Sequence, residues 1–465
     1  MTIPPQPAAY TADAKIQEMG GAISDPVAAA DFPKAILRFR NRRWDGAVGL
    51  DSLTDEEWIA HFGRFEPLPG NITRPLALRY HGHQFRQYNP EIGDGRGFLF
   101  AQLRDGAGRL LDLGTKGSGQ TPYSRFGDGR LTLKGGMREI LATEMLEALG
   151  VETSKTFSLI ETGEALQRND EPSPTRSSVL VRLSHSHVRI GTFQRLATLN
   201  EPDTMRALVG YVLRNLYGET PGDAPAGQLL GLVCERTAKL AASYMAAGFV
   251  HGVLNSDNIN VTGESFDYGP WRFTPTWAPA FTAAYFDHQG LYAFGRQASA
   301  IHWDVVELAK SLRLIAEAEE LAPALDRWPG LYEAAVAETI CARLGVAPCG
   351  EESDLALLQA MDEALQGTDA GIDRFFFDWR GGRRRGASPA DALYDGDAFK
   401  PFATAIAAYE ATVSLDHEYW ADANPCSMLI DEVETIWSAI NQRDDWSMLE
   451  DKVAAIRRMG EAMRA

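Results

Sequence analysis

Cysteine is scarce in this sequence of 465 residues, with only Cys234, Cys341, Cys349 and Cys426. The four positions are too few and too scattered for a disulfide framework, and no pair has the spacing of a zinc finger. Reduced cysteines fit a cytoplasmic protein, so we expect a cytoplasmic location.

Long apolar runs are also missing. No stretch of eighteen or more apolar residues exists to span a bilayer, and the N-terminal segment lacks the apolar core of a signal peptide. Basic residues are outnumbered: 45 Lys and Arg against 63 Asp and Glu give a net charge of −18. Because binding to a phosphate backbone needs a basic face, this balance argues against nucleic acid as a partner.

The chain divides into four segments by pattern. We expect a flexible tail over residues 1–30, where Pro, Ala and Gly occur without periodicity. Residues 31–202 predict a nucleotide-binding N-lobe of sheet and helix, and residues 203–312 a helical C-lobe with the catalytic and metal-binding loops. Residues 313–465 predict a helical extension of the C-lobe. This order indicates an α+β protein with the bilobal fold of protein kinases, a small mixed sheet followed by a larger helical part.

The strands of the N-lobe are predicted from short β-like runs separated by Gly-containing turns. The runs are LALRYHGHQF, GFLFAQLRD, RLLDLGTK, TFSLIET and SSVLVRLS. One helix is predicted over residues 130–149, where Met137, Ile140 and Met145 recur at helical spacing and Gly150 follows as a stop.

The segment HGVLNSDNINVTGESFDYG, residues 251–269, is laid out like a kinase catalytic centre. Kinases place an Asp two residues after the loop His, an Asn five residues further on, and an Asp-aromatic-Gly on the next strand. Asn258 and Asp267 stand where the metal ligands belong, but Val253 stands at the position of the base. Because valine cannot accept a proton, we identify Asp257 as the substitute.

Asn258 and Asp267 offer a neutral oxygen and a carboxylate, the hard ligands that Mg²⁺ accepts. Beside a metal, Asp257 is expected to titrate near or below about 3.9 and to be ionised at neutral pH. The alternative is an Asp-Asn turn with an unrelated Asp-Tyr-Gly turn.

Two features further upstream are typical of phosphate binding. The turn IGDGRG contains Gly93, Gly95 and Arg96, and such glycines let backbone amides approach an anion. On its own such a motif is more often an ordinary turn. Lys116 ends a predicted strand where kinases present a phosphate-binding lysine, and Glu139 lies in the one predicted helix, where it can pair with that lysine.

The loop GSGQTPYSRFGDGR follows Lys116 directly, so Asp128 and Gly129 are candidates for nucleotide contact, although such loops are often merely exposed. Arg182 lies in an apolar run, where a buried charge needs a partner such as phosphate, and Arg189 follows it. His185 and His187 could instead begin a metal site, but no further cluster of Cys or His ligands follows.

The chain resembles the selenoprotein O family, also called YdiU proteins, over residues 76–312. The matching text is YHGHQF, IGDGRG, LGTKGSGQTPYSRFGDGR, GGMREIL, SHVRIGTF, GFVHGVLNSDNINVTGESFDYGPW and YAFGRQ. The resemblance implies a protein adenylyltransferase of pseudokinase fold. In that family ATP is bound in reverse of the kinase orientation. The resemblance therefore implies that AMP passes to a Ser, Thr or Tyr hydroxyl of a protein and that pyrophosphate leaves.

The resemblance also implies the site residues and partners. The implied nucleotide contacts are Gly93, Gly95, Arg96, Lys116, Glu139, Asp128, Gly129, Arg182 and Arg189; the base is Asp257, and the magnesium ligands are Asn258 and Asp267. Manganese could replace magnesium. The implied acceptors are proteins, with the chain itself among them, and we expect a monomer.

Three alternatives remain: a uridylyltransferase using UTP with manganese, a kinase-type phosphotransferase, and a catalytically silent ATP-binding pseudokinase. Val253 disfavours the phosphotransferase. The family's redox cysteines have no counterpart in residues 279–290 or in the final GEAMRA, so regulation by such a disulfide is not expected.

Overall fold

The main sheet organises the first half of the chain. A computed structural model describes residues 6–169 and 171–465. The sheet has eight antiparallel strands in the order β1-β3-β6-β7-β10-β9-β2, with β8 paired to β10. Its strands are β1 (Ser24–Pro26), β2 (Ile36–Arg40), β3 (Leu76–Leu78), β6 (Leu99–Arg104), β7 (Leu110–Lys116), β8 (Leu131–Thr132), β9 (Lys155–Leu166) and β10 (Thr175–Ser184).

The predicted β-like runs are confirmed, with one change. Four of the runs form β6, β7, β9 and β10. The run LALRYHGHQF instead divides between β3 and a separate hairpin of β4 (Gly82–Gln84) and β5 (Gln87–Asn89). The strands β7, β9 and β10 are buried along most of their length, because both faces of the sheet are covered.

The predicted helix between the strands is α2 (Leu133–Ala148), which packs across β9 and β10. The hydroxyl of Thr132 accepts a hydrogen bond from the amide of Gly135 and begins the helix. Gly136 allows close packing, since a Cβ there would lie 2.3 Å from Leu159 of β9. This close approach presents Glu139 to the sheet.

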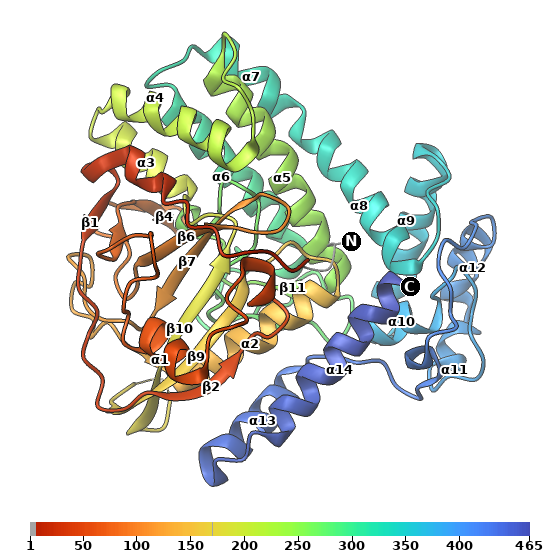
Figure 1. The fold of residues 1–465 in the computed structure, drawn as a ribbon. Coiled ribbons are helices and arrows are strands. Elements are labelled where there is room, and N and C mark those ends of the chain that lie inside the picture. Colours follow the sequence, from red (N-terminus) through yellow and green to blue (C-terminus); the bar gives the residue numbers. More distant parts are fainter. Residues whose placement is uncertain (1–5, 170) are drawn as a thin grey trace.

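Helices form most of the remaining chain (Figure 1). α5 lies beside α6 and α8, and α3 packs on α6. The helices are α1 (Asp55–Gly63), α3 (Ile190–Thr198), α4 (Pro202–Tyr211), α5 (Pro225–Ala247), α6 (Gln297–Leu312), α7 (Ala318–Asp326), α8 (Trp328–Leu344), α9 (Glu351–Gln366), α10 (Ile372–Asp378), α11 (Asp391–Tyr394), α12 (Lys400–Ile406), α13 (Ile430–Arg443) and α14 (Ser447–Arg464). Short elements are β11 (Phe249–Val250), β12 (Arg272–Phe273), a π-helix (Val212–Tyr217) and 3₁₀ turns at Lys15–Ala22, Gly46–Val48, Ser256–Asn258, Phe294–Arg296, Asp397–Phe399 and Glu418–Ala421.

One core of buried apolar side chains runs from the inner face of the sheet through α2 and α5 to α13 and α14. A second lies on the other face of the sheet under α1, where Trp58, Phe62 and Phe157 pack edge to face. A third joins α8 to α12. The first core therefore joins the sheet to α2, α5, α13 and α14.

The C-terminal helices return to the sheet-bearing part. α14 and α13 both contact α2, and they cross beneath it in Figure 1. Arg457 of α14 donates hydrogen bonds of 2.6 and 2.8 Å to the buried carboxylate of Glu144 on α2. The last helices therefore brace the helix that carries Glu139.

The predicted N-terminal tail is wrong for much of its length. Ile16, Met19 and Ile23 are buried, and β1 pairs with β3 in the main sheet. The apolar residues of this segment have no periodicity because a 3₁₀ turn and a three-residue strand carry them. Residues 1–5 lie outside the described part of the chain.

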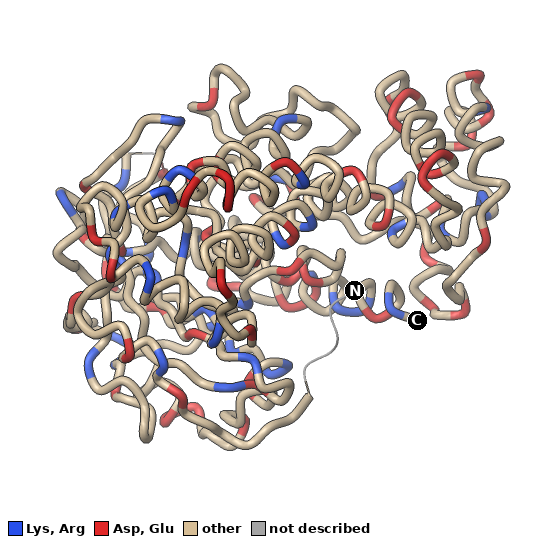
Figure 2. The backbone as a smooth tube through the Cα atoms, turned by 90° about the horizontal axis from the view of Figure 1, so that it is seen from above, with Lys and Arg blue, Asp and Glu red and all other residues tan. Residues whose placement is uncertain are grey.

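Acidic and basic residues occur in every part of the fold (Figure 2). Among the helices described, none combines the length and the apolar character that crossing a membrane requires. The four cysteines are unpaired, and Cys234 and Cys341 are buried.

Candidate active site

The centre of the candidate site is an ion cluster around Lys116, the last residue of β7. The Nζ atom of Lys116 lies 2.6 Å from Glu139 Oε1 and 2.7 Å from Asp267 Oδ1. Lys116 is 5% exposed and Glu139 is fully buried. The predicted pairing of Lys116 with Glu139 is therefore confirmed, and the predicted metal ligand Asp267 joins them.

Arg182 completes this cluster from β10. It is buried, as the apolar run around it predicted, and its Nη1 atom lies 3.3 Å from Asp267 Oδ1. Burial by itself would raise the pKa of Asp267, but the charges of Lys116, Arg182 and Arg189 hold that pKa well below its usual range. Asp267 adopts φ +65°, a left-handed conformation that Asp tolerates better than most residues.

The loop from His251 to Asn258 is tied to the strand that follows it. His251 is buried and its Nε2 donates to the main-chain oxygen of Phe266 at 3.0 Å. Asn258 donates from its side-chain nitrogen to the main-chain oxygen of Val253 at 3.0 Å. Val253, which replaces the kinase base, thus offers only its backbone to the loop.

Asp257 is nearly buried, at 8% exposure, and its Oδ1 atom has no hydrogen-bond partner among the described residues. Gly82 lies against it, because a Cβ at Gly82 would stand 3.0 Å from the Asp257 side chain. Burial raises the pKa of Asp257 to about 6, and the charge of Arg189 opposes the shift. Without a metal ion, desolvation outweighs the neighbouring cation, and the low pKa expected beside a metal stays a prediction.

Arg189 connects this loop to the glycine-containing turn. It is 2% exposed; its Nη1 donates to the main-chain oxygen of Asp257 at 3.0 Å, and its Nη2 lies 3.4 Å from Asp94 Oδ1. Its guanidinium also stacks 4.2 Å above the ring of Tyr80. Arg189 therefore holds Asp257 and the turn of residues 92–97 in one arrangement.

The turn of residues 92–97 and the loop of residues 117–130 are packed together. A Cβ at Gly93 would stand 2.5 Å from the ring of Tyr123, and a Cβ at Gly95 would stand 2.9 Å from the main-chain oxygen of Tyr123. The main-chain oxygen of Arg96 accepts a hydrogen bond from the amide of Gly117 at 2.6 Å. Both predicted phosphate-binding segments therefore meet at the end of β7.

Not every predicted residue joins the cluster. The Arg96 side chain is exposed, and Asp128 is 48% exposed and paired with Arg168 at 2.8 Å. Gly129 has φ +71° and closes the base of its loop, because a Cβ there would stand 2.3 Å from Gly119. Arg96, Asp128 and Gly129 lie on the loops rather than in the buried ion cluster.

Sequence reasoning missed two acidic residues of the site. Asp94 stands between the glycines of IGDGRG, and that position was an available signal. Asp304 of α6 is 1% exposed with one oxygen unpartnered among the described residues, and burial raises its pKa well above the usual range, with the nearby charge of Asp257 adding to the shift. Asp304 gave no signal, since it sits in an ordinary amphipathic helix.

The oxygen atoms of Asn258 and Asp267 suit a magnesium ion. The Asn258 amide oxygen accepts no hydrogen bond from the described residues, and Asp267 contacts cations through Oδ1 alone. No group of three or more His, Cys, Asp or Glu in the described chain is arranged as a metal site. Two protein oxygens are nevertheless enough for Mg²⁺, which takes its other ligands from water and phosphate. The ring Nδ1 of His187 lies 3.3 Å from Asp112 Oδ2, and His185 donates its main-chain amide to Glu264.

Comparison with known proteins finds related sequences over nearly the whole chain. A family model described as "Protein adenylyltransferase SelO" matches residues 8–457. A protein of Gloeobacter violaceus named "Protein nucleotidyltransferase YdiU" is 43% identical over 457 residues, covering 95% of this chain and 93% of its own. The protein of the same name from Synechocystis is 41% identical, covering 96% and 98%. One from Pseudomonas putida is 38% identical over 69% of this chain and 64% of its own.

Proposed function

The chain belongs to the SelO family of protein adenylyltransferases, and from that membership we propose that it transfers AMP from ATP to Ser, Thr or Tyr hydroxyls of proteins. It is a protein nucleotidyltransferase by the name that its relatives share. The observation that carries the proposal is the buried cluster in which Lys116 meets Glu139 and Asp267, with Arg182 beside them.

The cations of this cluster bind the phosphates of ATP. Lys116, Arg182 and Arg189 bring three positive charges to one place, and a nucleoside triphosphate supplies the negative charge to match them. Glycines 93 and 95 bring backbone close to the same end of β7, where amides can approach phosphate oxygens. Arg96, Asp128 and Gly129 contact the nucleotide from the two loops.

In the transfer step the acceptor hydroxyl oxygen attacks the α-phosphorus of ATP. A bond forms between that oxygen and phosphorus, the bond from the α-phosphorus to the bridging oxygen breaks, and pyrophosphate leaves with the electron pair. Asp257 takes the hydroxyl proton. Its Oδ1 atom has no partner among the described residues that would have to be displaced first.

Asn258 and Asp267 hold Mg²⁺ or Mn²⁺ in this proposal. Bound there, the ion neutralises phosphate charge during transfer. With the ion bound, Asp267 would share its carboxylate between the ion and Lys116, and Glu139 would remain a partner of Lys116.

We further propose a kinase-like arrangement of two lobes with this cluster between them. Residues 31–202 form the nucleotide-binding lobe, together with the strand and turn that precede them. Residues 203–312 supply the catalytic loops, and residues 313–465 extend the helical lobe and brace α2. The enzyme acts in the cytoplasm as a monomer.

Three labels distinguish the proposed reaction from the alternatives. Purified protein is incubated with ATP labelled at the α-phosphate, with ATP labelled at the γ-phosphate, and with α-labelled UTP, each with Mg²⁺ and with Mn²⁺. We expect ATP labelled at the α-phosphate to label protein and ATP labelled at the γ-phosphate to leave it unlabelled. The Asp267→Ala variant should abolish the labelling by the α-phosphate. Label from γ-ATP indicates a kinase, preference for UTP a uridylyltransferase, and no label under any condition a silent pseudokinase.

A further inference from the structure

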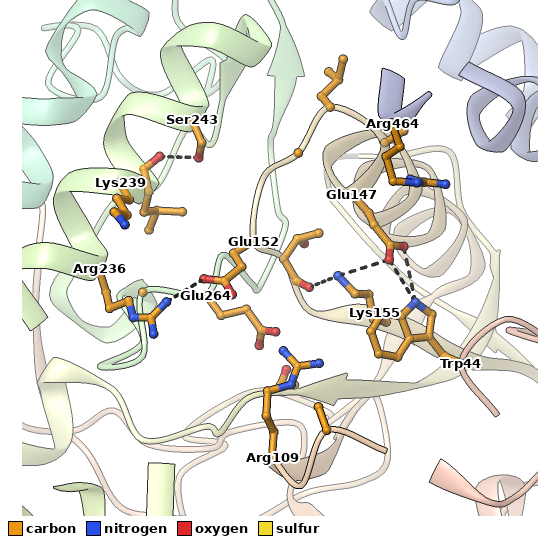
Figure 3. Close-up of a pocket in the computed structure, with 18 of the residues that line it drawn as sticks. Trp44, Arg109, Glu147, Glu152, Lys155, Arg236, Lys239, Ser243, Glu264 and Arg464 are labelled. Atoms are coloured by element: carbon orange, nitrogen blue, oxygen red, sulfur yellow. Dashed lines mark hydrogen bonds and ion pairs between the residues drawn. The ribbon is translucent and has the colours of Figure 1, made fainter. Parts of the chain in front are cut away.

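A cavity of about 720 Å³ lies apart from the candidate active site (Figure 3). Its walls come from the β6–β7 turn, the segment between α2 and β9, the helices α5 and α8, and the end of α14. Of the described residues that line it, none is a nucleotide or metal position named above. The volume is that of an ordinary small-molecule site.

Charged side chains of both signs line the cavity, with the basic ones in excess. The basic residues are Arg109, Lys155, Arg236, Lys239, Arg343 and Arg464, and the acidic residues are Asp105, Glu147, Glu152, Glu264 and Glu338. Three of the basic residues are satisfied by close partners. Arg109 pairs with Asp105 at 2.8 Å, and Arg343 pairs with Asp373, outside the cavity, at 2.7 Å. Lys155 donates a hydrogen bond of 2.6 Å to the main-chain oxygen of Thr153. The other basic residues are less engaged.

The side chains of Lys239 and Arg464 have no hydrogen-bond or ion-pair partner among the described residues. Arg236 is held only by Glu152, at the long distance of 3.7 Å. Arg236 and Lys239 lie three positions apart on α5, and both line the cavity. Two neighbouring cations without a strong partner favour an anion between them.

Glu264 gives the cavity a polar centre. Figure 3 shows it between Arg236 and Arg109, and its Oε2 accepts a hydrogen bond from the amide of His185 at 2.7 Å. Burial raises its pKa to about 7. The carboxyl can therefore present either a proton or a lone pair to a hydroxyl of a bound molecule.

Apolar side chains form the rest of the lining. Leu111, Leu149, Leu240 and Met463 come from four separate elements. A bare inorganic anion would leave this surface facing water, whereas a molecule with a carbon body would cover it. The lining therefore matches a ligand that has both an anionic group and an organic body.

We propose that this cavity is a second ligand-binding site, and that its ligand is a small organic phosphate. The phosphate group lies at Arg236 and Lys239, and the organic body lies against the apolar lining. Phosphate fits better than a carboxylate, because its three terminal oxygens can accept from both cations at once.

The site is connected to the active site through two short segments. Glu264 precedes Asp267 in one strand-like segment, and Leu111 lies on β7, which ends at Lys116. A ligand in the cavity thus touches the two segments that carry the active-site ion pair. For this reason the test uses binding, which is independent of nucleotidyl transfer.

The test is calorimetric titration of the full chain with three probes: phenyl phosphate, inorganic phosphate and phenol. We expect phenyl phosphate to bind with a Kd below about 1 mM and the other two to bind at least about tenfold more weakly. The double variant Arg236→Gln/Lys239→Gln should weaken phenyl phosphate binding about tenfold or more. Both positions are exposed, so the fold should tolerate the change.

The matched control is Lys310→Gln/Arg313→Gln, which removes two exposed cations at the same spacing near the end of α6. It should leave binding unchanged. A second variant, Ser243→Trp, fills the cavity without changing charge and should abolish binding.

Three results would overturn the proposal. They are unchanged affinity in both cavity variants, inorganic phosphate binding as tightly as phenyl phosphate, and no binding of phenyl phosphate up to about 10 mM. The first would place the ligand elsewhere, and the second would reduce the site to a general anion contact.

Discussion

The ammonium nitrogen of Lys116 lies 2.6 Å from a carboxylate oxygen of Glu139, although the two residues come from a strand and a helix 23 positions apart. Both side chains are buried, and the second oxygen of Glu139 has no partner among the described residues. A buried carboxylate of this kind depends on its one cation. Breaking this pair should therefore lower the free energy of unfolding more than breaking a surface ion pair would.

The Lys116→Met variant should lower the free energy of unfolding by about 3–5 kcal/mol, because it leaves Glu139 buried and uncompensated. Adding Glu139→Gln should recover most of that loss, since a neutral amide replaces the unpaired charge. Urea denaturation of the wild type, the two single variants and the double variant measures this coupling.

The matched control is the surface pair Lys134 and Glu434, whose side chains approach to 2.7 Å but are 23% and 46% exposed. The equivalent substitutions there should show a coupling of about 0–1 kcal/mol. Equal coupling at the buried and surface pairs would contradict the role given to burial.

Asp257→Asn should lower kcat for nucleotidyl transfer by about 10²–10⁴-fold while changing the affinity for ATP by less than about threefold. The amide has the shape of the carboxylate but cannot accept the hydroxyl proton. Steady-state transfer rates and equilibrium ATP binding separate the two effects. Asp203→Asn, at a fully exposed position of α4, is the control and should leave both unchanged. A loss of binding equal to the loss of rate would assign Asp257 to holding the nucleotide instead.

Strands and the helix of the sheet-bearing part could be predicted from the sequence because their apolar residues follow a regular period. The run that ends at Lys116 contains three leucines, and the run that forms β10 contains the apolar residues Val179, Leu180, Val181 and Leu183. The segment of Ile16 and Ile23 could not be predicted, because its packing comes from pairing with β3, far along the chain. Local pattern carries no information about such a partner.

The site residues could be predicted where they occupy fixed positions in a sequence motif. The properties that depend on burial could not be predicted. Lys116, Glu139 and Asp267 meet as their order indicated. The raised pKa of Asp257 comes from desolvation, which only the packed structure reveals. Asp304 joins the site from a helix that shows no motif.

Gly93→Val should raise the KM for ATP about tenfold or more, because its Cβ would stand 2.5 Å from the Tyr123 ring and push two loops apart. Initial rates at varied ATP concentration give the KM. The control is Gly231→Ala in α5, where a Cβ would meet nothing within 4 Å. An unchanged KM in Gly93→Val would separate this turn from nucleotide binding.

Asp444, at the end of α13, tests how the C-terminal helices are held to the sheet. It pairs with Arg176 of β10 at 2.7 Å and with Arg38 of β2 at 3.1 Å. Partial burial would raise its pKa, but hydrogen bonds from Arg176 and Trp446 and the charges of both arginines lower the pKa from 3.8 to about 2. Because the folded pKa lies below the unfolded one, this stabilisation is present above about pH 4 and disappears as the pH falls toward 2.

Asp444→Asn should therefore destabilise the protein by about 0.5–1 kcal/mol near neutral pH, a modest value because the side chain is half exposed. Asn tolerates the left-handed backbone of this position, φ +51°, so the change is one of charge alone. Urea midpoints of the two proteins should differ equally at about pH 7 and pH 5 and draw together at about pH 3. Asp397→Asn, at a 92% exposed position, should show no such dependence. A difference that widens on acidification would mean that Asp444 does not hold α13 to the sheet through its charge.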